Sequence, residues 1–260
     1  MSESDAAWPM ANYLSAWKTF RHLGNEPAAT AEHVISQPRW PSKDNLRILD
    51  VGCGDGQMAQ AFLLKMLKSQ TVAEVVLLDP EEGMLSEAAS LIRGAGFRGD
   101  IRRELGLADK EALKLAKEID VGLAIHVVYL LPHNRFRTFV NRWPVGIPLY
   151  VVLDAPDSVF SEIWPQTAVD YATRSRRVHE YLSGEANGGL KVHRTDFTTR
   201  MSDPFDLAPP VRDLALSLLC YGDYDEVPDG KKPIVRDAIL KHKEDGFVRC
   251  ACSCYELLRR

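Results

Sequence analysis

The chain has 260 residues, of which 45% are hydrophobic, and its formal net charge at pH 7 is −4. This length and hydrophobic content are enough for one large hydrophobic core with small insertions, so we expect a single domain over residues 1–260. Lysines and arginines are scattered instead of clustered, which disfavours a nucleic-acid partner.

Nothing in the sequence predicts export or a membrane partner. No stretch reaches the roughly 20 apolar residues of a membrane helix, and the N-terminus lacks a signal peptide's basic-then-apolar layout. The five cysteines include no CxxC pair, which is untypical of a disulfide framework or a zinc site. We expect a cytoplasmic protein without a metal. Cys250, Cys252 and Cys254 are interpreted as small core residues on one face of a strand.

The first 45 residues predict a helical cap. Tyr13, Trp17 and Phe20 recur near helical spacing, and Gly24 is a plausible helix stop. A proline-containing segment, QPRWPS, then leads to the first predicted strand.

Strands and helices alternate from residue 46. Strands are predicted at 46–52, 74–79, 100–105, 119–128 and 148–155, and helices at 56–69, through Met84 and Leu91, and at 109–117. Such alternation is typical of parallel strands joined by crossover helices. We therefore predict a doubly wound α/β domain with residues 46–155 as its core.

The pattern changes after residue 155. Residues 157–183 are expected to be helical, which is more than a simple crossover needs. Two further strands are predicted at 189–201 and 246–258, with helical segments near 211–219 and 233–242 between them. The complete sheet would then have seven strands, mostly parallel, and residues 156–188 and 202–245 would be helical insertions on the substrate side.

The segment ILDVGCGDGQ, residues 48–57, joins an apolar strand to a helix through a three-glycine turn. Glycines allow a sharp reversal and a close approach of backbone to ligand, and ligands of open α/β sheets bind at the carboxyl ends of strands. A dinucleotide loop has the spacing G-x-G-x-x-G, but Gln57 replaces its last glycine here. Asp50 adds negative charge, which suits a cationic sulfonium better than a phosphate.

Asp79 ends the next predicted strand, in VVLLDP. A carboxylate at this position can accept hydrogen bonds from both hydroxyls of a ribose. A lone glycine triplet is often only a turn and a lone aspartate only a helix cap, but their combination makes these simpler interpretations improbable.

These two segments resemble the first two motifs of class I S-adenosylmethionine-dependent methyltransferases. The resemblance covers residues 46–155 and implies a Rossmann-like fold with S-adenosylmethionine as cofactor. It places the methionine part of the cofactor near Gly52, the ribose at Asp79, the adenine near Met84 and the transferable methyl beside Ile125 and His126. The cofactor-binding candidates are Asp50, Gly52, Gly54, Asp79, Pro80, Met84 and Ile125.

The flanking segments resemble the histamine N-methyltransferase family. Its N-terminal aromatic helix followed by a substrate-binding glutamate corresponds to Tyr13, Trp17, Phe20 and Glu26. Further matches are Ile125, Tyr129, Phe160 and Trp164. Departures at His126, Leu130, Ala251 and Cys252 argue against a histamine-specific site but not against a small-molecule pocket.

The resemblance suggests roles for these residues. Glu26 and His126 are the catalytic candidates: Glu26 would bind a cationic amine or imidazole, and His126 would orient the nucleophile or accept its proton. Tyr13, Trp17, Phe20, Glu26, Tyr129, Phe160 and Trp164 are the substrate-binding candidates. The simpler alternatives are a solvated glutamate beside Pro27, a core histidine and core aromatic residues.

The sequence therefore predicts methyl transfer to a nitrogen, less readily an oxygen, of a small amine- or imidazole-containing metabolite. The alternatives are a methyltransferase acting on a protein side chain or RNA, and a catalytically inactive cofactor-binding module. A dehydrogenase is disfavoured by the glycine spacing. The oligomeric state stays open.

Overall fold

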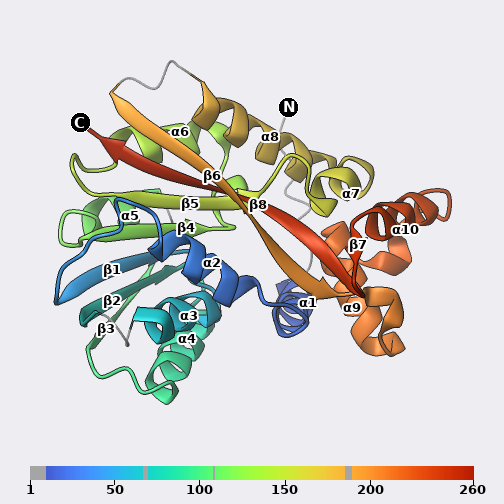
Figure 1. Ribbon diagram of the computed structural model, residues 1–260, viewed down its shortest axis with the longest axis horizontal. Helices are drawn as coiled ribbons and strands as arrows, with labels where there is room; N and C mark the ends of the chain where they lie inside the picture. The colour runs from blue at the N-terminus through green and yellow to red at the C-terminus, as the bar shows by residue number, and fades with distance from the viewer. Residues whose placement is uncertain (1–9, 67–69, 108, 185–188) are drawn as a thin grey trace. The chain divides into compact units, whose positions relative to one another are not determined.

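The structure, a computed structural model, describes residues 10–66, 70–107, 109–184 and 189–260, with side chains from residue 15 onward (Figure 1). The strands are β1 (Leu46–Val51), β2 (Val72–Asp79), β3 (Asp100–Leu105), β4 (Val121–Ile125), β5 (Leu149–Asp154), β6 (Leu190–Ser202), β7 (Lys243–Glu244) and β8 (Phe247–Arg259). The helices are α1 (Met10–His22), α2 (Glu26–Ile35), α3 (Gln57–Met66), α4 (Glu82–Gly94), α5 (Glu111–Leu115), α6 (His133–Arg142), α7 (Val159–Thr167), α8 (Val169–Ser183), α9 (Pro209–Cys220) and α10 (Lys232–Lys241). Short 3₁₀ helices are η1 (Val128–Leu130), η2 (Pro204–Asp206) and η3 (Tyr224–Glu226).

The described strands form one sheet with the order β3-β2-β1-β4-β5-β8-β6, and β7 pairs with β8 beside this path. The pairs β1–β2, β1–β4, β2–β3 and β4–β5 are parallel. Strands β4 and β5 are buried at every residue, as is typical of central parallel strands covered on both faces. The predicted doubly wound, mostly parallel α/β sheet is confirmed, but the described sheet has eight strands and not the predicted seven, because the two-residue strand β7 pairs with β8.

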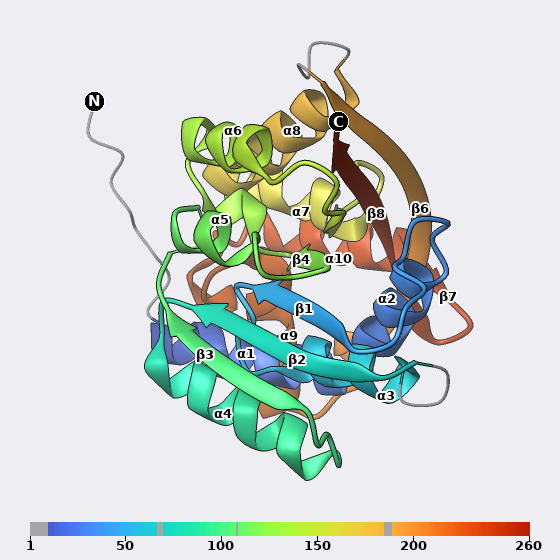
Figure 2. The same cartoon turned by 90° about the vertical axis from the view of Figure 1, so that its left-hand side faces the viewer.

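The chain order reverses between β1 and β4. From β1 the chain continues outward through β2 and β3, and it then returns to form β4 on the other side of β1. Figure 2 shows β1, β2 and β3 side by side, with α4 along their face. Ligands of open α/β sheets bind at such a switch point, at the carboxyl ends of the strands. The loop after β1 lies at this switch point.

Two predicted elements differ from the structure. The fourth strand was predicted at 119–128 but ends at Ile125, because His126 has a φ of 52° and η1 follows. The helix expected over 157–183 is divided into α7 and α8. Ala168, three residues after Pro165, leaves the helical region with φ −137° and ψ 62°, which breaks the hydrogen-bonded ladder.

Helix α2 was not predicted as a separate element. It begins with Glu26 followed by Pro27, and both residues suit the first turn of a helix. Proline lacks the N–H that would be unsatisfied there, and a carboxylate interacts favourably with the positive end of the helix dipole.

The chain divides into two compact units. The helical unit contains, of the described residues, 10–26, 154–173 and 198–252. Within it α1 packs on α9, and α7 packs on α9 and α10. The sheet unit contains residues 27–153, 174–197 and 253–260. Strands β6 and β8 each contribute residues to both units.

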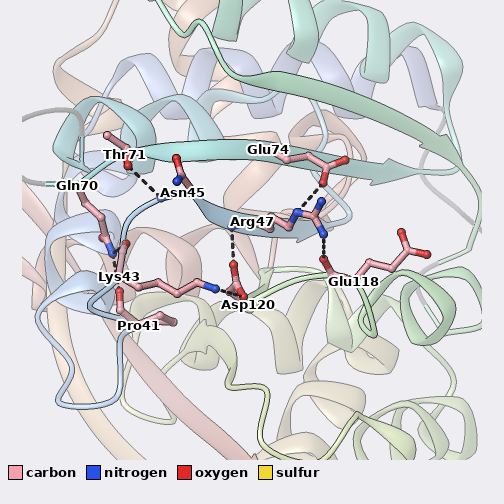
Figure 3. A network of polar contacts seen from close by, with 9 residues as sticks. All are labelled: Pro41, Lys43, Asn45, Arg47, Gln70, Thr71, Glu74, Glu118 and Asp120. Atoms are coloured by element: carbon pink, nitrogen blue, oxygen red, sulfur yellow. Dashed lines mark hydrogen bonds and ion pairs between the residues drawn. The ribbon is translucent and has the colours of Figure 1, made fainter.

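A polar network fixes the start of β1 in the sheet unit (Figure 3). The backbone N–H of Arg47 donates to Asp120 Oδ2 at 2.9 Å, and Lys43 Nζ lies 2.6 Å from Asp120 Oδ1. The N–H of Asn45 donates to Thr71 Oγ1 at 2.9 Å. These bonds hold β1 at the end opposite to the glycine loop.

All five cysteines are buried and unpaired with one another, including Cys250, Cys252 and Cys254 in β8. None of the helices in the described part of the chain is both long and apolar enough to span a membrane.

Candidate active site

The loop after β1, residues 52–57, is named the cofactor loop. Gly52, Gly54 and Gly56 have φ values of 69°, 54° and 83°, in the left-handed region that favours glycine. A Cβ on Gly52 would lie 2.4 Å from Val127 Cγ2, whereas a Cβ on Gly54 would meet nothing within 4 Å. Gly52 is therefore required for packing, while Gly54 presents its backbone to open space that a ligand can occupy.

Asp79, the last residue of β2, joins the cofactor loop to the neighbouring strand. Its Oδ2 accepts the N–H of Gly54 at 3.0 Å, and its Oδ1 accepts the N–H of Glu81 at 3.0 Å. Each oxygen keeps a second lone pair for a ribose hydroxyl. Burial raises the pKa of Asp79, and the two backbone donors partly offset this effect.

Carboxylates surround the thiol of Cys53 within the cofactor loop. Burial raises the pKa of Cys53, and Asp50, Asp79 and Asp55 raise it further. Asp55 accepts the N–H of Gln57 at 3.2 Å at the start of α3. This concentration of negative charge suits a sulfonium or an α-ammonium group and opposes a pyrophosphate.

The carboxyl end of β4 carries a strained residue. His126 has a φ of 52° and is 7% exposed, and its N–H donates to Val152 O at 2.9 Å. A non-glycine residue in this region costs of order 1 kcal/mol, and such strain is concentrated at functional sites. The turn brings Val127 against Gly52, so His126 directly precedes the residue that packs on the cofactor loop.

The remaining cofactor candidates also lie in the sheet unit. Ile125 ends β4 and is 6% exposed, and Met84 is buried in the first turns of α4. Pro80 directly follows Asp79 and is exposed. Tyr129, a substrate candidate, is buried in η1.

The other substrate candidates gather in the helical unit. Trp17 and Phe20 of α1 stack with centroids 6.3 Å apart, and Phe20 contacts Phe160 of α7 at 5.8 Å. Phe160 contacts Trp164 at 5.4 Å. We call these four rings together with Glu26 the acceptor cluster. The side chain of Tyr13 lies outside the described residues.

Glu26 is buried and not in a solvated turn. It is 6% exposed, and the preceding Asn25 is fixed to β6, where its N–H donates to Arg200 O at 3.0 Å and its Oδ1 accepts the N–H of Arg200 at 2.7 Å. Burial of a carboxylate is costly unless the charge is compensated. The alternative interpretation of Glu26 as a solvated carboxylate was therefore wrong.

Several residues near the acceptor cluster were not singled out from the sequence. The Arg21 guanidinium lies 4.5 Å from the Trp17 ring centroid, and Tyr221 contacts Trp164 at 6.0 Å. Asp154 ends β5 and is 5% exposed. Asp154 is the last residue of its strand, as Asp79 is. This shared position is a signal by which Asp154 could have been identified from the sequence as a site candidate.

Among the described residues, no group of three or more histidine, cysteine, aspartate or glutamate side chains is arranged to hold a metal ion.

Comparison with known proteins agrees with this geometry. Residues 48–143 match a family model described as a methyltransferase domain. No curated protein sequence matches the chain. The fold resembles the YcgJ protein of Bacillus subtilis, at 14% identity and a TM-score of 0.54, with 89% of this chain and 98% of that chain covered.

Two further solved structures of similar fold are S-adenosylmethionine-dependent methyltransferases in complex with S-adenosylhomocysteine. The one from Thiobacillus denitrificans is 13% identical, with a TM-score of 0.52 and 96% and 98% of the two chains covered. The one from Geobacter sulfurreducens is 11% identical, with a TM-score of 0.54 and 98% and 100% covered. At these identities the likeness is one of fold.

An open parallel sheet that reverses between β1 and β4, a three-glycine loop after β1 and an acidic residue at the end of β2 are the structural features that underlie the resemblance predicted from the sequence. The family match spans this loop. Residues 48–143 match a methyltransferase domain, and the fold of the chain resembles that of class I S-adenosylmethionine-dependent methyltransferases. The predicted resemblance to this superfamily is confirmed.

Proposed function

We propose that this methyltransferase acts on a nitrogen of a small amine- or imidazole-containing metabolite. The observation that carries the proposal is Glu26, a buried carboxylate in the same unit as four contacting aromatic rings. A carboxylate and aromatic faces both attract an organic cation. They offer less to a neutral hydroxyl or to a phosphate backbone.

The cofactor residues are proposed to act as the superfamily resemblance implies. Gly52 and Gly54 would hold the methionine part of the cofactor, with Asp50 nearby, Asp79 would accept the ribose hydroxyls, and Met84, Pro80 and Ile125 would border the rest. When bound, the cofactor supplies a methyl group on a positively charged sulfur.

The residues of this chain would bind the acceptor and control its protonation. The acceptor nitrogen must be neutral, because its lone pair forms the new N–C bond while the electron pair of the broken C–S bond goes to sulfur. The nitrogen then releases one proton. We propose that Glu26 binds a cationic group of the acceptor and that His126 orients the reacting nitrogen or accepts its proton.

Glu26→Gln tests the proposed acceptor role. Loss of a charge-assisted hydrogen bond is expected to raise KM for amine acceptors by roughly tenfold or more, while S-adenosylmethionine affinity stays unchanged. Radiolabelled methyl transfer to a panel of amines, imidazoles and their hydroxyl counterparts provides the measurement. Glu32→Gln is the matched control, because Glu32 lies in the same helix and its side chain is 69% exposed.

Two outcomes would contradict the proposal. Turnover of hydroxyl acceptors with no turnover of amines would reject nitrogen methylation. Equal kinetics of the Glu26 and Glu32 variants would reject the role of Glu26.

A further inference from the structure

Asp154 is a second buried carboxylate of the helical unit, and the proposed function has not used it. It is the last residue of β5 and is 5% exposed. Ligand-binding groups of open α/β sheets are found at this position, directly after a strand's carboxyl end. Its neighbourhood can be established from two independent sets of contacts.

The first set consists of contacts between strands β5, β8 and β6. Beside Asp154, the N–H of Ala155 donates to Ala251 O at 2.8 Å, which places the end of β5 next to Cys250 and Cys252. Burial raises the pKa of both thiols, and Asp154 and then Glu26 raise each of them further. Both carboxylates therefore lie close to the same two sulfur atoms.

Glu26 is connected to Cys250 through contacts that involve β6. Asn25, the preceding residue, exchanges two hydrogen bonds with Arg200. Thr199, next to Arg200, donates its hydroxyl to Cys250 O at 3.3 Å. In the strand order β8 lies between β5 and β6. Asp154 ends β5, and the residue before Glu26 is hydrogen-bonded to β6, so the two carboxylates are connected to the two strands that flank β8.

The second set consists of a contact between helices α1 and α7. Phe20, six residues before Glu26, contacts Phe160, six residues after Asp154, with centroids 5.8 Å apart. This aromatic contact joins the two segments that carry the carboxylates. The four aromatic rings of the acceptor cluster lie in these same two segments of the helical unit.

A buried hydroxyl accompanies Asp154. Ser158 is 0% exposed and precedes α7, yet its side chain does not cap that helix. Within the described residues its Oγ has no hydrogen-bond partner. Buried polar atoms are nearly always hydrogen-bonded, so an exception calls for a missing partner. A polar ligand beside Asp154 would supply one.

We propose that Asp154 and Ser158 complete the acceptor site that begins with Glu26, and that this site prefers small acceptors with two nitrogen atoms. The proposal rests on the proposed function. Glu26 holds the nitrogen that stays protonated, and Asp154 accepts a hydrogen bond from the nitrogen that receives the methyl group. Asp154 is a specificity residue, because two carboxylates can each accept a hydrogen bond from a ligand with two nitrogen atoms. A ligand with one nitrogen and a terminal methyl group leaves one carboxylate without a donor.

Three ligands with the same carbon chain test this preference without any variant. We would titrate the full chain, saturated with S-adenosylhomocysteine, with diaminobutane, aminobutanol and butylamine by isothermal calorimetry. The wild type is expected to bind diaminobutane roughly tenfold or more tightly than butylamine, since one additional charge-assisted hydrogen bond corresponds to about that factor.

Variants assign the preference to Asp154. Asp154→Asn, which keeps the side-chain shape, is expected to reduce the preference for diaminobutane over butylamine to within about twofold, with butylamine affinity nearly unchanged. Ser158→Ala should weaken the binding of diaminobutane more than that of butylamine, because butylamine has no second polar group to pair with Ser158. Asp157→Asn is the matched control, because Asp157 is exposed in the same turn and should behave as wild type. Thermal unfolding and S-adenosylmethionine affinity establish that each variant is folded.

The outcomes separate this inference from the proposed function. A wild type without preference for diaminobutane, or an Asp154→Asn variant that keeps the preference, overturns the inference. If Glu26→Gln still weakens amine turnover in that case, the proposed function stands. If neither diaminobutane nor butylamine binds measurably, both fail. If the Asp154→Asn variant misfolds, the wild-type ligand series and the Ser158→Ala variant test the inference instead.

Discussion

The carboxylate of Asp79 has a structural role, and we propose that it also binds the ribose of the cofactor. It accepts two backbone N–H groups at 3.0 Å and is 8% exposed. Asp79→Asn should weaken S-adenosylmethionine binding by roughly tenfold to a hundredfold, which corresponds to about 1.5–3 kcal/mol for hydrogen bonds to a charged group. Calorimetric titration measures the effect.

The pH dependence of binding gives a second test of Asp79. Because burial raises the pKa of Asp79 above its ordinary value, protonation begins at a higher pH than for an exposed aspartate. Cofactor affinity should therefore fall as the pH falls through this raised pKa, and the Asp79→Asn variant should lack this dependence. An identical pH profile in the two proteins would contradict the ribose-binding role.

His126 allows backbone strain to be separated from side-chain chemistry. Both His126→Gly and His126→Ala remove the imidazole, so both should slow turnover. Only glycine accepts a φ of 52° without a Cβ penalty. The glycine variant should therefore be more stable than the alanine variant by roughly 0.5–1 kcal/mol, as measured by denaturant unfolding. An alanine variant of equal or higher stability would contradict the assigned strain.

At the scale of the element, the three glycines of the cofactor loop differ in purpose. Gly52→Ala should destabilise the protein by about 1–3 kcal/mol, because its Cβ would lie 2.4 Å from Val127 Cγ2. Gly54→Ala has free space and should cost only about 1 kcal/mol of left-handed strain, yet it should impair cofactor binding. Unfolding curves and calorimetry of the two variants, with Gly52→Ala combined with Val127→Ala as a control for the clash, check this contrast.

The strand-helix elements were predictable because local pattern and global fold agree. Strand β3 has its predicted bounds, β1 differs from its prediction by one residue at one end, and β5 and β6 differ from theirs by one residue at each end. Strand β4 was predicted too long because Val127 and Val128 continue the apolar run. The turn at His126 depends on packing against β5 and Gly52, which no local pattern encodes.

At the scale of the whole molecule, the spatial grouping of the cofactor candidates was easier to predict than that of the acceptor candidates. Asp50, Gly52, Gly54 and Asp79 lie on short segments that end parallel strands, so spacing alone brings them together. Glu26 and Asp154 are 128 positions apart in the printed sequence. Their common neighbourhood depends on β6, β8 and the packing of α1 with α7, and these long-range contacts leave little local signal.

The most direct test of the account is a calorimetric titration of the purified chain with S-adenosylmethionine and, separately, with NADH. The glycine spacing, the carboxylates around the cofactor loop and the position of Asp79 predict micromolar binding of the sulfonium and no measurable binding of the dinucleotide. Tighter binding of NADH, or no binding of S-adenosylmethionine, would contradict the assignment and leave only the doubly wound fold.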